Sequence, residues 1–237
     1  MHGLMFHRIG SSVRIFEQCV TDNPDSHMAG VGLGPDVLRL LERFDRVAEI
    51  PLGIPSVQLQ SLDQQGKAHP FLKARRILSS WDALYFRLRA NFDMLASDHV
   101  PFPPLTTLVG DENTSRPRST ASYEAGKQVL GVESLETGQL RVTYKDLRNY
   151  GKEEQVVADL VLGADGPNSV MRKLFHAQGC TERRYAGYLA WRGVVPEEHV
   201  SEATRDIFRE NITYSILKGG AGHVIVYVNT MKLSLWT

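Results

Sequence analysis

Apolar side chains recur at helical spacing in three stretches of the chain. Within residues 80–95 they fall at positions i, i+3, i+4, i+7 and i+11, which predicts an amphipathic helix. The apolar positions of residues 37–44 share one face in the same way, and Pro35 stands where a first helical turn favours proline. A shorter pattern over residues 1–9 predicts a third helix, with Gly10 at its C-terminal end.

Alternating or largely apolar runs predict β-strands along much of the remaining chain. The predicted strands are residues 12–17, 105–109, 129–135, 140–144, 155–163, 185–195, 212–217 and 223–228. The run 155–163 is expected to be buried and to end in a glycine-rich turn, and the last two strands are expected to pair as a hairpin. Residues 50–70 carry turn signals and short alternating pieces, 111–126 are expected to be a loop, and 198–208 have a helical pattern.

The order of these elements predicts the fold class. Strands alternate with helices early in the chain and become hairpins late. This order is typical of a mixed α/β fold, in which a nucleotide-binding part is interrupted by a mostly antiparallel part. A helix in progress at residue 1 and a strand close to residue 237 give the expectation that both ends are truncated.

Composition excludes several classes of function. The 237 residues carry 27 Lys and Arg against 27 Asp and Glu, so we expect no nucleic-acid or membrane partner. The first residues lack the basic and long apolar regions of a signal peptide, and the apolar stretches are too short to span a bilayer. Two cysteines, Cys19 and Cys180, indicate a reducing compartment, and we expect a cytoplasmic protein. No cluster has the spacing of metal ligands, so no metal site is predicted.

The most informative segment is residues 158–172, Ala-Asp-Leu-Val-Leu-Gly-Ala-Asp-Gly-Pro-Asn-Ser-Val-Met-Arg. We expect Asp165 at the end of a strand, followed by a helix that begins near residues 167–169. A carboxylate there can accept hydrogen bonds from sugar-like hydroxyls, and Gly166 lets the backbone approach a bulky ligand. A bare Asp-Gly pair is most often only a turn, so the longer string carries the interpretation.

This string resembles the Asp-Gly motif of the class A flavoprotein monooxygenases, the aromatic hydroxylases built like p-hydroxybenzoate hydroxylase. Asp165 and Gly166 match the motif, and Ser169 and Arg172 complete it. The resemblance implies that Asp165 contacts the ribityl chain of FAD. It implies that the motif also takes part in the use of NAD(P)H. Arg172 is expected either near phosphates or on a solvated helix face.

Three further segments resemble the same family in order and spacing. Residues 14–17 look like the end of its second strand, which implies that Glu17 binds the adenosine ribose; the alternative is a surface acid. Residues 29–35 resemble its next loop and helix entry, and we interpret their glycines as a loop rather than as a phosphate-binding turn. Residues 81–88 and 185–195 are similar to the 2,6-dihydroxypyridine and salicylate hydroxylase branch.

The resemblance implies an incomplete Rossmann-like FAD-binding domain with an inserted, mostly antiparallel substrate domain, both truncated. Residues 1–180 are assigned to FAD binding, with residues 50–80 able to contribute to the substrate domain, and residues 181–237 to substrate binding. Tyr188 and Trp191 are candidate pocket residues or sheet-packing aromatics. Arg192 is expected to point to solvent or to the flavin.

The activity implied by the family is FAD-dependent, NAD(P)H-using hydroxylation of an aromatic or electron-rich ring through a flavin C4a-hydroperoxide. No catalytic base can be named, and the resemblance allows a homodimer. The Gly-x-Gly-x-x-Gly turn of this family would precede residue 1, since only 16 residues come before Glu17. Two alternatives therefore stay open: an inactive flavoprotein fragment, or a non-catalytic binding module completed by another chain.

Overall fold

The computed structural model describes residues 1–21, 29–63, 65–104, 119–176, 181–182, 184–187, 193, 195–208, 211–216 and 223–226. The chain divides into two compact units, and each is described by itself. Unit 1 comprises residues 1–12, 26–120 and 191–237, and unit 2 comprises residues 13–25 and 121–190. Helices and both parallel and antiparallel strand pairs are present, which confirms the mixed α/β class. The assignment of residue ranges to cofactor and substrate binding stays a prediction.

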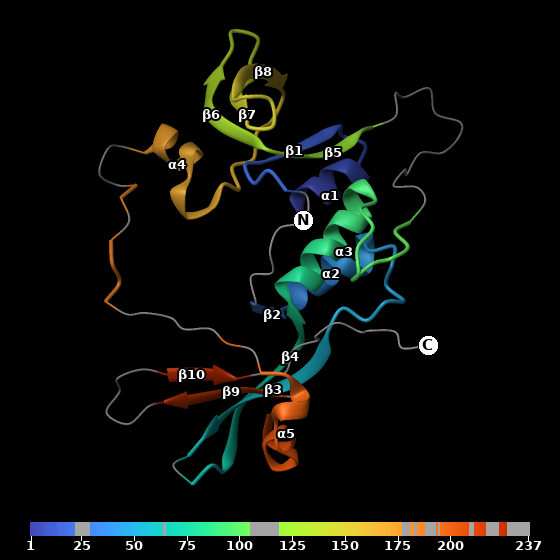
Figure 1. Ribbon diagram of the computed structural model, residues 1–237, viewed down its shortest axis with the longest axis vertical. Coiled ribbons are helices and arrows are strands. Elements are labelled where there is room, and N and C mark those ends of the chain that lie inside the picture. The colour runs from blue at the N-terminus through green and yellow to red at the C-terminus, as the bar shows by residue number, and fades with distance from the viewer. Residues whose placement is uncertain are drawn as a thin grey trace. The chain divides into compact units, whose positions relative to one another are not determined.

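Unit 1 contains the three helices that the apolar spacing predicts. They are α1 (His2–Arg8), α2 (Pro35–Phe44) and α3 (Trp81–Asp93), and α1 contacts both of the others (Figure 1). Their ends follow the sequence signals. The Ser80 hydroxyl accepts the Ala83 amide at 3.0 Å and caps α3, and Gly10 has a φ of +97° just after α1.

A five-stranded sheet in unit 1 has the order β10-β9-β3-β4-β2. Its members are β2 (Gly30–Leu33), β3 (Ile54–Leu62), β4 (Ala68–Ser80), β9 (Asn211–Ile216) and β10 (His223–Val226). Neighbours pair antiparallel except β3 and β9, which are parallel. The predicted hairpin of the last two strands is confirmed. A 3-10 turn (Glu197–His199) and α5 (Glu202–Phe208) precede β9, and α5 contacts that strand (Figure 1).

The helices of unit 1 are joined to the segment 45–50 by a buried polar cluster. Arg87 on α3 pairs with Asp45 at 2.7 Å and donates to the carbonyls of Val47 and Ile50. Asn91, one turn further along α3, donates to the second carboxylate oxygen of Asp45 at 2.7 Å. Apolar contacts of Val47 with Ala90 and Val100 lie beside this cluster. The two terminal nitrogens of Arg87 and both carboxylate oxygens of Asp45 have partners here, whereas Nε of Arg87 has none, so the cluster ties α3 to the segment 45–50 through most of its polar atoms.

Unit 2 is built from two small sheets. The strands β1 (Val13–Glu17) and β5 (Ala121–Ala125) pair in parallel. The strands β6 (Lys127–Ser134), β7 (Leu140–Asp146) and β8 (Lys152–Ala158) form an antiparallel meander (Figure 1). A 3-10 turn (Gly166–Asn168) and α4 (Val170–Phe175) follow, and α4 contacts β6.

Hydrogen bonds to charged groups reinforce each of the two sheets of unit 2, and one aromatic contact joins them. Arg14 on β1 makes a two-pronged ion pair with Glu124 on β5, with N–O distances of 2.7 and 2.8 Å. The ring of Phe16 lies 4.6 Å from that of Tyr144, between centroids, and the Tyr144 hydroxyl donates to Glu154 at 3.0 Å. The ring contact between Phe16 and Tyr144 therefore joins the two sheets, whereas the Arg14–Glu124 pair acts within the first.

Several predicted elements were wrong in detail. Residues 121–125, expected to be loop, form β5, because pairing with β1 satisfies their backbone. Residues 30–33, interpreted as loop, form β2 against β4. The short pieces expected within 50–70 are the long strands β3 and β4. No strand is assigned at 185–187, 193 or 195, the described residues of the predicted strand 185–195. The predicted strand 105–109 lies outside the described residues.

The largest correction concerns the segment before Asp165. The strand expected at 155–163 is β8, which ends at Ala158, seven residues before Asp165. The run is also not buried, since Leu160 is 58% and Leu162 is 52% exposed. Asp165 therefore follows a segment without regular secondary structure rather than a strand end. The helix start expected near residues 167–169 is confirmed, because Ser169 is the N-cap of α4.

Candidate functional site

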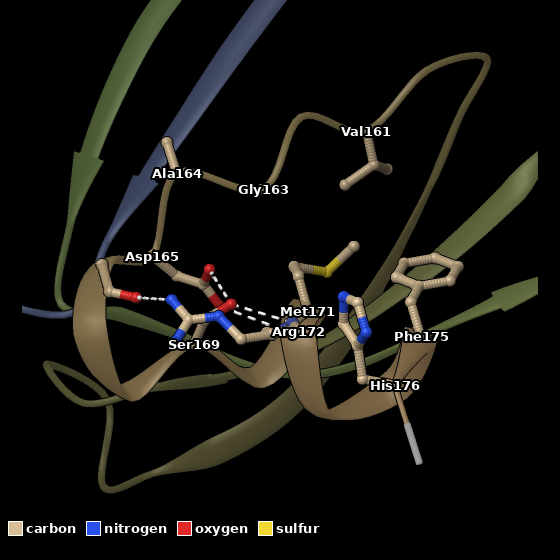
Figure 2. A pocket seen from close by; sticks show the side chains of 10 residues that line it. Val161, Gly163, Ala164, Asp165, Ser169, Met171, Arg172, Phe175 and His176 are labelled. Atoms are coloured by element: carbon tan, nitrogen blue, oxygen red, sulfur yellow. Dashed lines mark hydrogen bonds between the residues drawn. The ribbon is translucent and has the colours of Figure 1, made fainter. Parts of the chain in front are cut away.

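A pocket in unit 2 lies between the segment that precedes Asp165 and the helix α4 (Figure 2). Its volume is about 650 Å³. One wall is apolar and the other carries the Asp-Gly motif. The lining residues are Val161, Gly163, Ala164, Asp165, Gly166, Ser169, Met171, Arg172, Phe175 and His176. All four predicted motif positions, Asp165, Gly166, Ser169 and Arg172, are therefore brought together.

The carboxylate of Asp165 is hydrogen-bonded to the first turn of α4. Oδ2 accepts the amides of Val170 at 2.7 Å and Met171 at 3.1 Å, and Oδ1 accepts the Ser169 hydroxyl (Figure 2). These donors are the free N–H groups and the capping hydroxyl of a helix start, which favour a negative charge. Asp165 thus has a local structural role in addition to any ligand contact.

The environment of Asp165 keeps its carboxyl ionised. Partial burial raises the pKa of Asp165, but hydrogen bonds from the Ser169 hydroxyl and from the amides of Met171, Asp165 itself and Val170 lower it more. The net effect is a pKa below the usual value for an aspartate. At neutral pH the site therefore presents an acceptor-only carboxylate, which suits a ligand that donates hydroxyl protons.

Gly166 and Arg172 shape the turn next to this carboxylate. Gly166 has a φ of +72°, and no heavy atom lies within 4 Å of where a Cβ would stand. The guanidinium of Arg172 bends back and donates to the Gly166 carbonyl at 3.0 Å (Figure 2). This contact fixes the turn and leaves a positive charge beside it. The backbone at Gly166 is open to a ligand because no side chain fills the space next to its Cα.

Ser169 and the apolar wall add residues whose roles the sequence did not reveal. Ser169 is only 7% exposed and accepts the Arg172 amide at 2.9 Å. Met171 and Phe175 are one helical turn apart on α4, and both line the pocket with Val161 (Figure 2). Their i, i+4 spacing predicts that the two side chains share one face of a helix. It does not predict that this face lines a pocket.

Glu17 lies at the end of β1, as predicted, but it does not line this pocket. Its Oε1 accepts the Cys19 amide at 2.8 Å, which closes the turn after the strand. The structure therefore places Glu17 and Asp165 in the same unit without joining them in one pocket. Tyr188, Trp191 and Arg192, the predicted substrate-pocket residues, lie outside the described residues.

The described part of the chain offers neither a metal cluster nor a membrane-spanning helix. No group of three or more His, Cys, Asp or Glu side chains there could hold a metal ion. None of the described helices is long and apolar enough to cross a membrane.

Three curated proteins are similar to this chain in sequence. The 2,6-dihydroxypyridine 3-monooxygenase of Paenarthrobacter nicotinovorans is 33% identical over 106 residues, 44% of this chain and 23% of the relative. The 6-hydroxynicotinate 3-monooxygenase of Bordetella bronchiseptica is 29% identical over 80% of this chain and 43% of the relative. The salicylate hydroxylase of Pseudomonas putida is 26% identical over 75% of this chain and 36% of the relative.

The chain is a relative of the FAD-dependent aromatic monooxygenases. A family model described as FAD binding domain-like also matches residues 185–231. The chain spans less than half the length of each of the three curated relatives. The resemblance found in the motif at residues 158–172 is thereby confirmed at the level of the family.

Two solved structures share part of the arrangement of this chain. One, from Photorhabdus luminescens and described as a FAD-containing monooxygenase, has a TM-score of 0.42 at 20% identity and covers 73% of this chain and 38% of its own. The other, the flavin-dependent halogenase CmlS, has a TM-score of 0.49 at 15% identity and covers 73% and 28%.

Proposed function

We propose that this chain is the FAD-handling and substrate-handling part of a monooxygenase that hydroxylates an electron-rich aromatic ring. The observation that carries the proposal is the turn at Asp165 and Gly166, where an ionised carboxylate stands beside an open glycine backbone. Three relatives whose names describe hydroxylation of aromatic or heteroaromatic rings support it.

The described residues fit one part of FAD. The carboxylate of Asp165 is suited to the hydroxyls of a ribityl chain, and Gly166 leaves room for a bulky group to approach. Arg172 would contribute positive charge towards the phosphates. Glu17 would hold the ribose of the adenosine, and in the described structure its hydrogen bond uses Oε1 only. When bound, FAD supplies the redox chemistry that activates oxygen.

The remaining parts of the proposal depend on the family alone. NAD(P)H is proposed as the reductant, and a small aromatic molecule as the substrate, with Tyr188, Trp191 and Arg192 as its pocket. A homodimer and a cytoplasmic location belong to the same proposal, the latter on the count of two cysteines.

The test is a titration of the 237-residue chain with FAD, in which the quenching of flavin fluorescence measures binding. We expect saturable binding that Asp165→Asn weakens about tenfold, the size of one hydrogen bond to a charged group. Asp159→Asn is the matched control, because Asp159 lies in the same segment, does not line the pocket and accepts the Gln139 side-chain amide at 3.0 Å. It should leave binding unchanged.

Activity is tested on the same preparation. A set of hydroxypyridines and hydroxybenzoates should stimulate oxidation of NAD(P)H with formation of a hydroxylated product. Absence of FAD binding by the chain alone would contradict the proposal and favour an inactive fragment. Binding that returns only when a second polypeptide is added would favour a module completed by another chain.

A further inference from the structure

The hydroxyl of Ser169 lies between the helix α4 and the carboxylate of Asp165. Its oxygen accepts the Arg172 amide at 2.9 Å, and its proton goes to Oδ1 of Asp165. The side chain is 7% exposed, so water does not readily replace either contact. A serine hydroxyl has one proton, and an ionised carboxylate can only accept, so the direction of both hydrogen bonds is fixed.

The two oxygens of Asp165 are used differently. Oδ2 is bonded to the amides of Val170 and Met171, which point along the helix. Among the described residues, the side chain that contacts Oδ1 is Ser169. Both groups line the pocket beside Gly166 (Figure 2). Rotation of the carboxylate about its terminal bond would break the Ser169 contact, so Ser169 holds Oδ1 in place together with the two amides on Oδ2.

We infer that Ser169 is a positioning residue of this site, which holds Oδ1 of Asp165 in the orientation that accepts a hydroxyl of the ligand. The inference rests on the proposed function, since the ligand hydroxyl is that of the FAD ribityl chain. Ser169 also caps α4, so the test must separate its donation to Asp165 from its capping of the helix.

Three substitutions of Ser169 make this separation. Ser169→Thr keeps both the donor and the cap. Ser169→Ala removes both. Ser169→Gly removes the donor, while glycine remains an acceptable N-cap. Ser201→Ala is the control, because the Ser201 hydroxyl accepts the Thr204 amide at 3.2 Å at the start of α5 in unit 1, whereas Asp165 belongs to unit 2.

The first measurement is the affinity of each variant for FAD. We expect Ser169→Gly and Ser169→Ala to weaken binding about tenfold alike, with Ser169→Thr and Ser201→Ala close to the wild type. In an Asp165→Asn background, Ser169→Gly should cause no further loss. If Ser169→Gly binds FAD as the wild type does and only Ser169→Ala is weak, capping alone explains the residue and the inference is overturned.

The second measurement needs no FAD, which keeps the inference separate from the proposed function. Titration of the Asp165 carboxyl by carbon-detected NMR should show its pKa raised in Ser169→Gly and Ser169→Ala, and unchanged in Ser169→Thr. A wild-type chain that fails to bind FAD would refute the proposed function. An Asp165 pKa that is insensitive to Ser169→Gly would overturn the positioning role whether or not FAD binds.

Discussion

Replacement of Arg87 by methionine is expected to destabilise the protein strongly. Arg87 and Asp45 are paired at 2.7 Å with side chains only 3% and 6% exposed. Methionine fills a similar length but has no charge, so the Asp45 carboxylate would stay buried with the Asn91 amide and the Val47 backbone amide as partners. The carbonyls of Val47 and Ile50 would also lose the Arg87 donor, although the Val47 carbonyl keeps the Ile50 amide at 3.1 Å.

The magnitude follows from the burial of this pair. Removing one partner of a buried ion pair costs about 3–5 kcal/mol, because an uncompensated charge remains. Urea denaturation followed by circular dichroism measures the loss in the free energy of unfolding. Arg39→Met is the matched control, since the Arg39 and Asp36 side chains on α2 are 70% and 88% exposed, and it should cost at most about 1 kcal/mol.

A double substitution tests the cause of the loss. In the Arg87→Met background, Asp45→Asn removes the buried charge and should restore part of the stability. The reasoning is refuted if Arg87→Met costs no more than Arg39→Met. It is also refuted if Asp45→Asn adds its full separate cost to that of Arg87→Met, because independent effects would mean that the two side chains do not interact.

Three further predictions concern pH and packing. The hydrogen bond from Arg14 holds the pKa of Glu124 low, so the free energy of unfolding should fall as acid titrates this carboxylate from about pH 4.5 downward. Glu124→Gln should flatten that part of a curve of unfolding free energy against pH. Burial and the charge of the neighbouring Arg8 lower the pKa of His7, so the melting temperature should fall as the pH drops below about 6.5. His7→Gln should abolish this fall in thermal melts. A Cβ at Gly53 would overlap the carbonyl oxygen of Leu78, so Gly53→Ala should cost about 1–3 kcal/mol in urea denaturation, whereas Gly131→Ala, with nothing within 4 Å, should be nearly neutral.

Local elements could be predicted from the sequence because their causes are local. The helix α3 needs only its apolar spacing and the capping hydroxyl of Ser80, and both are visible in the sequence. The hairpin of β6 and β7 follows in the same way from alternation and a short turn. These elements depend on residues a few positions apart.

Long-range pairing could not be predicted in this way. The strand β5 contains Ser122 and Glu124, which resemble a loop until β1 supplies a parallel partner and Arg14 supplies a countercharge. The parallel pairing of β3 with β9 likewise joins Gln58 to Asn211. Nothing in either segment alone specifies its partner, because the pairing energy arises only after the chain has closed a long loop.

The candidate site was predicted in part for the same reason. The string around Asp165 is a local signal, and it singled out Asp165, Gly166 and Arg172 as site residues. The structure brings these three residues to one pocket. The apolar run before it was expected to be a buried strand, since its composition alone does not show whether other elements cover it. The hydrogen bonds that hold the carboxylate depend on side-chain orientation, which spacing does not determine.

The chain passes four times between the two units, at residues 12–13, 25–26, 120–121 and 190–191. No contiguous stretch therefore corresponds to a whole unit. Cleavage after residue 210 would remove β9 and β10 and leave β3 as an unpaired sheet edge, which favours aggregation. Removal of the first 20 residues would take β1 from β5 and α1 from α2 and α3. Domain dissection by simple truncation should thus yield insoluble pieces, and excision of unit 2 would require circularly rearranged or linker-joined genes.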